Sequence, residues 1–530
     1  MFLSPIDAQR FPGKRAWENF TFFADGRFHA FFATGTPDGS DTWGSPNKID
    51  IAVSDDGVRW RFIARDILRI PGAHAGFGVV RIGDRTMYYP TCSNHGKDVH
   101  FKVFASRDLL SWEHLGDRFD VRPDYRYYHG RWDELCVLHE QEDGGDVYYG
   151  YISSEVREDV GAPSVGMMKS RDGVVWEVLP PPVIEWGELP AQHMELNFCE
   201  KIDGRWYLSM SGRFYLDSYG YSLFTFVGDS PLGPFRPDRE MFRLAGTSRR
   251  SVTWLGHTIQ TPDGLLLALW LSVRQLHDLP SNTFGIGPLK RLCCENGHLR
   301  LRWWEGNESA KGPTVPIEAG MLQWVHPAPA ARTGRDTMRS GPDGVELSAS
   351  RDGALVMLDH RFDAAKGFVI EGRLEVRAGQ GHVPSHRHAA AAGFFFEGTP
   401  GRGCAVIPDT LGVTRIGSIA FADHRITEED CYRNAGASLV ASRSGELRGT
   451  CAFTCEDTVG PFGHASYCGV RHGQSHRFRL IARGDYFEFY IDDYYVQTFV
   501  LPIPFTGRMG LLAFDGIARF EGVAAWDIAL

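Results

Sequence analysis

Short apolar segments separated by polar turns run through the first part of the chain. The segments Phe20–Ala24 and Phe28–Phe32 flank the turn residues Asp25, Gly26 and Arg27. Two such segments around an Asp-Gly turn predict a β-hairpin. The arrangement recurs at four further places: residues 78–82 with 86–89, 135–138 with 147–151, 193–200 with 206–210, and 252–255 with 265–270. No extended run has helical periodicity, so the pattern predicts an all-β fold.

A seven-residue motif, Ser-x-Asp-x-x-x-Trp, recurs between these hairpins. It spans Ser54–Trp60, Ser106–Trp112 and Ser170–Trp176, and Asp229–Phe235 is a variant that ends in Phe. We expect the Ser and Asp side chains to bond the turn backbone and the aromatic residue to pack between sheets, which is a structural role. Successive motifs are roughly 50 to 65 residues apart, a period typical of propellers and solenoids. Five such units predict a five-bladed β-propeller over residues 1–312.

The pattern changes after residue 312. Residues 313–343 are rich in Pro, Gly, Ala and Arg, which predicts a linker between domains. Residues 344–530 show alternating strands without the Trp motif, and the clearest lie at 367–376, 478–483, 486–491 and 494–500. Asp492 and Asp493 form a hairpin turn between the last two. This second domain is predicted to be a β-sandwich of the lectin-like, carbohydrate-associated type.

Composition and charge narrow the function. Aromatic residues make up 13% of the chain, and 60 Gly and 29 Pro supply turns, which favours many short strands. The net charge of -10 has no basic block, which argues against nucleic acid as a partner. No segment approaches the roughly 20 apolar residues that span a bilayer. The N-terminus lacks the pattern of a signal peptide, so we expect a cytoplasmic protein unless the start is a processed one.

The cysteines do not predict a metal site. Of the ten Cys, Cys451 and Cys455 come nearest to a metal-ligand spacing, and no second Cys or His pair follows at zinc-ligand spacing. We therefore expect reduced thiols and no metal or cofactor. The sequence does not indicate an oligomeric state.

Three of the predicted inner strands begin with an acidic residue. Glu18 opens the first, Asp133 the third and Glu195 the fourth. Acids are poor strand formers, so their presence at equivalent places suggests chemistry. Two carboxylates across a sugar ring are the minimum for glycoside hydrolysis. Glu195 precedes an apolar strand, and burial raises the pKa of a carboxylic acid, as a proton donor requires.

Short motifs at these strand starts resemble a known group. The motifs are Trp17-Glu18-Asn19-Phe20 before Asp25-Gly26, Ala73-His74-Ala75-Gly76-Phe77-Gly78, Trp132-Asp133-Glu134, Glu195-Leu196-Asn197, and Gly287-Pro288-Leu289-Lys290-Arg291-Leu292. They resemble the five-bladed propeller hydrolases of glycoside hydrolase families 32 and 43, and their layout is closer to family 32. The sequence departs from family 32 at Glu18, where the family has Asp, at Glu134, where it has Pro, and at Leu196-Asn197, where it has Cys-Pro.

The resemblance implies a glycosidase that acts on a furanoside containing fructose or arabinose. Glu195 would be the general acid, and Glu18 would attack the anomeric carbon or activate water. Asp133 would hold the substrate, with Glu134 as its competitor, since strand alternation lets only one of the two face the channel. The Glu18 carboxylate reaches roughly 1–1.5 Å further than an Asp would. Further candidates for substrate contact are Trp17, Asn19, His74, Arg131, Trp132, Trp186, His193, Arg213, Arg250 and Trp254.

Two alternatives stay open. One is a glycan-binding protein that has lost catalysis, which Glu18 in place of Asp and the missing Pro residues at 134 and 197 favour. The other is a glycosyltransferring enzyme on the same scaffold. The partner in each case is an oligo- or polysaccharide. A carboxyl separation near 5–5.5 Å would indicate a retaining hydrolase, and about 6.5–9.5 Å an inverting one.

Overall fold

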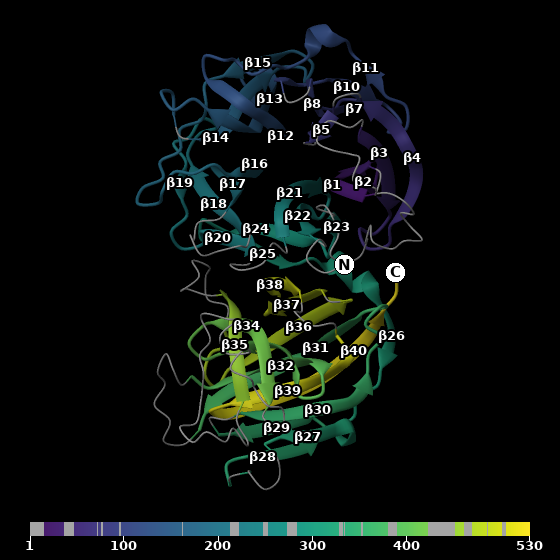
Figure 1. Cartoon of the computed structure of the whole chain (residues 1–530), viewed down its shortest axis with the longest axis vertical. Helices are drawn as coiled ribbons and strands as arrows, with labels where there is room; N and C mark the ends of the chain where they lie inside the picture. The colour runs from purple at the N-terminus through teal and green to yellow at the C-terminus, as the bar shows by residue number, and fades with distance from the viewer. Residues whose placement is uncertain are drawn as a thin grey trace. The chain divides into compact units, whose positions relative to one another are not determined.

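The structure is a computed structural model of the chain (Figure 1). It describes residues 15–35, 47–70, 73–75, 78–94, 97–161, 163–212, 222–246, 253–272, 284–327, 332, 334–350, 353–379, 389–421, 451–459, 469–484, 486–500 and 505–530. The chain divides into two compact units, one built chiefly from residues 1–307 and the other from 308–529. Each unit is described by itself.

The first unit contains five larger antiparallel sheets, each built around four strands. The first sheet is β1 (Arg15–Ala24), β2 (Arg27–Gly35), β3 (Asn47–Ser54) and β4 (Arg61–Ile70). The second is β6 (Val79–Ile82), β7 (Arg85–Tyr88), β10 (Phe104–Ser106) and β11 (Glu113–His114). The third is β12 (Tyr128–Glu142), β13 (Gly145–Val156), β14 (Ser164–Ser170) and β15 (Trp176–Leu179).

The fourth sheet is β16 (Glu195–Ile202), β17 (Arg205–Gly212), β18 (Ser222–Gly228) and β19 (Arg236–Pro237), with β20 (Arg243–Gly246) also paired to β18. The fifth is β21 (Thr253–Thr261), β22 (Gly264–Ser272), β24 (Lys290–Glu295) and β25 (His298–Trp303), with β23 (Phe284–Ile286) on β22. A small sheet of β5 (Ala73–Ala75), β8 (Thr91–Asn94) and β9 (Lys97–Phe101) adjoins the second. The five larger sheets are the blades of a propeller. The predicted five-bladed β-propeller is therefore confirmed.

Asp-Gly and Asn-Gly turns produce the hairpins. Asp25 and Gly26, which join β1 to β2, have φ values of 52° and 77°. Asp203 and Gly204 join β16 to β17 in the same left-handed conformation, with φ values of 51° and 79°. This conformation matches the right-handed twist of paired strands and is tolerated by Asp and Gly. The turn signals in the sequence therefore located the hairpins correctly.

The Ser-x-Asp-x-x-x-Trp motif is a structural turn, as predicted. Asp108 Oδ1 accepts hydrogen bonds from the N–H groups of Ser111, at 2.7 Å, and Leu110, at 2.9 Å. These bonds lower the pKa of Asp108 to about 2. The indole of Trp112 donates to the carbonyl of Leu109 at 3.0 Å. Asp56 and Asp172 make the equivalent bonds in the first and third blades.

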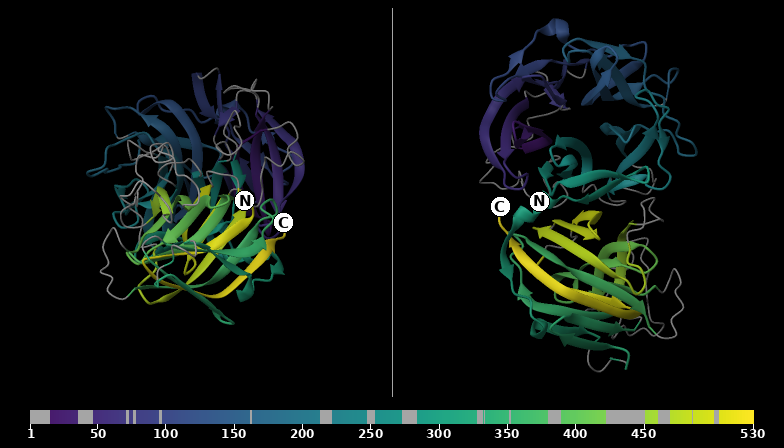
Figure 2. Two further views of the ribbon diagram at one scale, coloured as in Figure 1. Left: turned by 60° about the horizontal axis from the view of Figure 1, so that its bottom comes forward. Right: turned by 180° about the vertical axis from the view of Figure 1, so that it is seen from behind.

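The second unit is a sandwich of two antiparallel sheets (Figure 2). One sheet has the order β38 (Tyr494–Val500), β37 (Tyr486–Ile491), β36 (Ser475–Arg483), β31 (Phe368–Ala378), β40 (Gly516–Ile528), β29 (Gly344–Ala349), β28 (Thr337–Gly341), and β26 (Lys311–Val315) also pairs with β40. The other has the order β27 (Leu322–His326), β30 (Ala354–Arg361), β39 (Arg508–Phe514), β32 (Ala391–Thr399), β33 (Arg402–Pro408), β34 (Thr414–Phe421), β35 (Cys451–Val459). Aromatic residues from both sheets, including Phe394, Phe396, Phe478 and Phe487, fill the core between them. The predicted β-sandwich is confirmed.

The predicted linker is wrong. The second unit begins at residue 308 and not after 343. Within the expected linker, 313–343, most of β26 pairs with β40, β27 pairs with β30 and β28 pairs with β29. The Pro and Gly residues of this segment lie among short strands of the sandwich. Composition alone gave the wrong domain boundary, because several of these strands pair with strands that are distant in the sequence.

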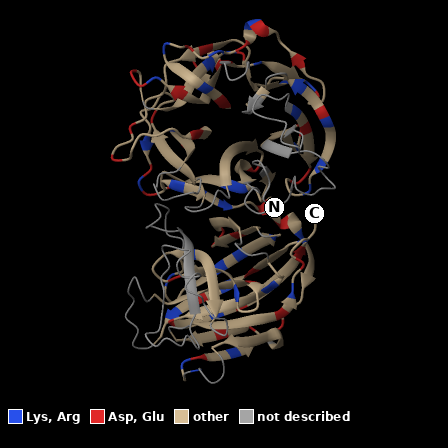
Figure 3. Ribbon diagram, viewed as in Figure 1, with Lys and Arg blue, Asp and Glu red and all other residues tan. Residues whose placement is uncertain are grey.

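The remaining expectations concern the distribution of charge, membrane spans, helices and cysteines. Acidic and basic residues are interspersed over the described parts of both units (Figure 3). Among the described residues, no helix has the length and apolar character needed to cross a membrane. The helices described are short 3-10 turns: η1 (Asp117–Phe119), η2 (Glu305–Ala310) and η3 (Ala319–Met321). Cys92, Cys136, Cys199, Cys293, Cys294 and Cys404 are free thiols, as expected.

Candidate active site

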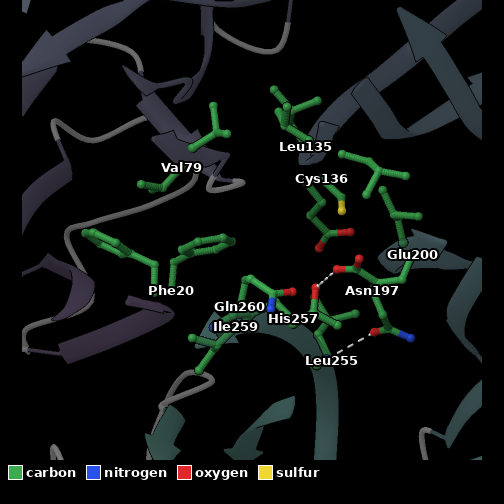
Figure 4. Close-up of a pocket in the computed structure, with 18 of the residues that line it drawn as sticks. Phe20, Val79, Leu135, Cys136, Asn197, Glu200, Leu255, His257, Ile259 and Gln260 are labelled. Carbon is green, nitrogen blue, oxygen red and sulfur yellow. Dashed lines mark hydrogen bonds between the residues drawn. The ribbon is translucent and has the colours of Figure 1, made fainter. Parts of the chain in front are cut away.

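The inner strands of all five blades line one cavity of about 440 Å³ (Figure 4). Its wall is largely apolar, with Phe20 from β1, Val79 from β6, Leu135 from β12, and Leu255 and Ile259 from β21. Polar groups lie at separate places on the wall: Glu134, Asn197, Glu200, Thr258 and Gln260. The cavity is therefore the centre of the propeller, and its shape follows from the inward faces of the five strands.

At one end of the cavity, the guanidinium of Arg131 binds three carboxylates. Its Nε lies 2.6 Å from Oδ1 of Asp133, one terminal nitrogen lies 3.1 Å from Oε2 of Glu134, and the other lies 3.1 Å from Oε1 of Glu195. Only 21% of the Arg131 side chain and 10–15% of the three carboxylate side chains are exposed. The sequence predicted Arg131 only as a group that could bond hydroxyls, and its role as the hub of the cluster was missed.

A β-bulge brings Asp133 and Glu134 to the same guanidinium. Glu134 has a φ of 54°, and the pairing of β12 with β13 shifts register between Asp133 and Cys136. A bulge breaks the alternation of side chains along a strand. Both acids therefore contact Arg131, and of the two it is Glu134 that lines the cavity. A left-handed Glu is strained and is retained here by its contacts.

The charge balance favours a proton in this cluster. Burial raises the pKa of Glu134 well above its usual range; Arg131 opposes this, and Glu195 and Asp133 add to it. Burial also raises the pKa of Asp133, again against Arg131. One guanidinium neutralises one of three carboxylates, so full ionisation would leave two uncompensated charges in a mostly buried site. The site thus favours a proton at a higher pH than an ordinary carboxylic acid does.

Glu195 stands at the start of β16, as predicted, and both of its oxygens have partners. Oε1 faces Arg131, and Oε2 accepts a hydrogen bond from the indole N–H of Trp254 at 2.8 Å. Trp254 is half-buried at the start of β21. The sequence predicted that Trp254 contacts substrate, and the structure gives it a contact to the candidate acid.

Ser153 links the third and fourth blades behind the carboxylates. Its hydroxyl donates to Oε2 of Glu134 at 2.6 Å and accepts from the N–H of Leu196 at 2.7 Å. The sequence reasoning missed Ser153, because a Ser in the second strand of a blade gives no local signal. Asn197, which replaces a family Pro, is buried; its Oδ1 accepts from the hydroxyl of Ser211 at 2.9 Å and the N–H of Gly256 at 3.1 Å. These bonds fix the register of β16 against its neighbours.

His193 lies just ahead of β16. Its Nε2 is 3.2 Å from a terminal nitrogen of Arg131. Burial and the nearby guanidinium lower the pKa of His193. A neutral imidazole can accept the Arg131 hydrogen bond, so His193 adjoins the carboxylate cluster, and its contact with substrate stays a prediction.

The backbone of Glu18 lies at the same end of the channel. Glu18 is in β1, opposite Ala33 of β2. Three residues further along, the N–H of Thr21 donates to Nε2 of His257 at 2.6 Å. Trp254 likewise precedes His257 by three residues, and strands rise by about 3.3 Å per residue. Glu18 is therefore near the level of Trp254, although its side chain is outside the described residues.

The other predicted contacts have mixed outcomes. The side chains of Trp17 and His74, and all of Arg213 and Arg250, lie outside the described residues. Asn19 is fully buried, and its amide has no hydrogen-bond partner among the described residues. Trp132 does not form a stacking face, because its ring is fully buried against Phe101 and Tyr128. Trp186 is also a core residue, in the cluster around Phe226.

A second acid in the cavity was not singled out by the sequence. Glu200 lies five residues along β16 from Glu195, roughly 16 Å away at the usual strand rise. It accepts a hydrogen bond from Thr258, drawn as a dashed line in Figure 4. Burial raises the pKa of Glu200 to about 7, partly opposed by Thr258. This distance places Glu200 outside the range of a catalytic pair with Glu195.

Several solved structures share this fold. The β-fructofuranosidase of Bombyx mori aligns over 99% of this chain and 95% of its own, with 14% identity and a TM-score of 0.59. Fructan 1-exohydrolase IIa from Cichorium intybus aligns over 97% and 95%, with 12% identity and a TM-score of 0.60. A fructosyltransferase from A. japonicus aligns over 97% and 95%, with 9% identity and a TM-score of 0.60. No protein-family profile and no curated protein sequence matches the chain. The chain thus has the propeller-and-sandwich fold of glycoside hydrolase family 32.

Proposed function

We propose that the chain is a glycoside hydrolase that acts on a furanoside, with fructose- or arabinose-containing oligosaccharides as the substrate class. The observation that carries this proposal is the convergence of Asp133, Glu134 and Glu195 on Arg131 at one end of the propeller channel. The neighbours in fold that act on fructosides support the same substrate class.

In the proposed mechanism, Glu195 donates a proton to the oxygen of the scissile bond. Its carboxylate is paired with Arg131. Sugar hydroxyls that draw hydrogen bonds from Arg131 would weaken this pairing. The neighbouring Glu134, whose pKa is raised by burial, is the source of the proton that Glu195 passes on. The glycosidic bond breaks through an oxocarbenium-like transition state next to the carboxylates, and the leaving group departs with the proton from Glu195.

Glu18 is proposed as the second catalytic carboxylate. It would attack the anomeric carbon in a retaining reaction or activate water in an inverting one. Asp133, held by Arg131 at 2.6 Å, would accept hydrogen bonds from ring hydroxyls. Arg131 and His193 complete the polar wall. The apolar wall beyond Glu134 offers few hydrogen bonds to a sugar, so we infer that the sugar binds at the end of the channel that holds the carboxylates.

The test is sugar release from a panel of fructose- and arabinofuranose-terminated oligosaccharides by the wild-type chain and Glu195→Gln. A hydrolase releases free sugar, and the variant loses about 100-fold or more of that rate. At high substrate concentration, longer oligosaccharides in place of free sugar would identify a transferase. Glycan binding without any product from the wild-type chain would refute an enzymatic role.

A further inference from the structure

A carboxylate oxygen in the second blade lacks a partner. Only 2% of the Asp120 side chain is exposed. Its Oδ2 faces Nε2 of His100 at 3.4 Å, Nζ of Lys102 at 3.5 Å, and a terminal nitrogen of Arg122 at 3.7 Å. Its Oδ1 is buried and has no hydrogen-bond partner among the residues that the structure describes. A buried carboxylate oxygen without a partner destabilises the fold. The direction in which it points therefore indicates where a missing partner would bind.

The unpaired oxygen points at a histidine across a gap. Oδ1 of Asp120 lies 3.7 Å from Nε2 of His114, and Oδ1 of Asp117 lies 3.9 Å from the same nitrogen. Both separations are too long for hydrogen bonds. Donor atoms of the three residues lie within 4.8 Å of one another. Two ligands bound at about 2.0–2.2 Å to one ion are themselves roughly 3–3.6 Å apart, close to the observed spacing.

We propose that His114, Asp117 and Asp120 bind a divalent transition-metal ion. One imidazole and two carboxylates suit ions such as Zn²⁺ and Mn²⁺. The ion would supply the missing partner of Asp120 Oδ1. It would also join the end of β11, which carries His114, to η1, which begins at Asp117, and to the residue that follows η1. Its role is to stabilise the outer edge of the blade, away from the candidate active site.

Positive charges near the site lower its affinity for a divalent cation. Lys102 lies 3.1 Å from Oδ1 of Asp117, so its ammonium opposes the ion. Arg122 lies on the Oδ2 side of Asp120 and is paired with Asp98. This pairing offsets part of the positive charge of Arg122. Replacing Lys102 with an uncharged residue of similar length should therefore strengthen metal binding.

Isothermal titration of the full-length chain with Zn²⁺ alone and with Mn²⁺ alone tests the site. We expect one ion per chain, binding at least 10-fold weaker in His114→Ala, and tighter binding in Lys102→Met. The His114 side chain is 31% exposed, so His114→Ala should fold, which circular dichroism would check. His472→Ala, which removes an exposed imidazole from the sandwich, should bind like the wild type. Absence of saturable binding by both ions, or equal binding by wild type and His114→Ala, would overturn the proposal.

Discussion

The indole N–H of Trp254 donates to Oε2 of Glu195 at 2.8 Å, across the boundary between the fifth and fourth blades. Because Arg131 holds the other oxygen at 3.1 Å, the carboxylate plane is set before substrate enters. An active site gains from such fixed orientation, since small displacements of a catalytic group lower the rate strongly. Trp254 is thus a positioning residue in our account.

Trp254→Phe should lower kcat by about 10-fold or more, because it removes a charge-assisted hydrogen bond worth roughly 1.5–3 kcal/mol while keeping an aromatic ring. Steady-state kinetics on a cleaved furanoside would separate kcat from KM. Trp176→Phe is the matched control, since it removes an indole bond of 3.1 Å to the carbonyl of Gly173 in a turn. An equal fall in kcat for both variants would contradict the positioning role.

Arg131→Met should destabilise the fold by about 3–5 kcal/mol, because it leaves three mostly buried carboxylates without their shared cation. Urea unfolding at pH 7 would measure the loss. Adding Glu134→Gln to Arg131→Met should restore part of the stability, since one acid becomes neutral. If the single variant is as stable as the wild type, Arg131 does not stabilise the three carboxylates.

Local signals in the sequence predicted more of the fold than of the site. The Asp25–Gly26 and Asp203–Gly204 turns and the Ser-x-Asp-x-x-x-Trp motif act within a few residues, so their structures could be predicted. The cluster on Arg131 depends on a bulge at Glu134, and a bulge leaves little trace in a single sequence. The linker error has a similar cause, because β26 pairs with β40 about 200 residues away.

Glu200 should make stability depend on pH. Because burial raises its pKa to about 7 in the folded chain, the folded state retains a proton that the unfolded state, with the ordinary value of 4.5, releases. Stability attributable to Glu200 is therefore highest below about pH 4.5 and is lost as the pH rises to about 7, by up to about 3 kcal/mol. Unfolding of wild type and Glu200→Gln across this range would measure the difference. Identical pH slopes would contradict the assignment.

Asp108→Ala should lower stability by about 1 kcal/mol, the usual cost of removing a side-chain acceptor that caps backbone N–H groups. Activity should not change, since Asp108 bonds only within its turn. Its pKa of about 2 predicts that the difference from wild type is present above about pH 4 and shrinks as the pH falls towards 2. Thermal unfolding at several pH values provides the test. A fall in kcat at unchanged stability would assign the motif a role in chemistry.

The central claim is that Glu195 is the general acid of a furanosidase. The most direct test compares wild type and Glu195→Gln on a natural furanosyl oligosaccharide and on a nitrophenyl furanoside, whose leaving group needs little protonation. We expect the variant to lose about 100- to 10,000-fold in kcat/KM on the oligosaccharide and far less on the nitrophenyl glycoside. Equal losses on both substrates, or full activity of the variant on the oligosaccharide, would contradict it.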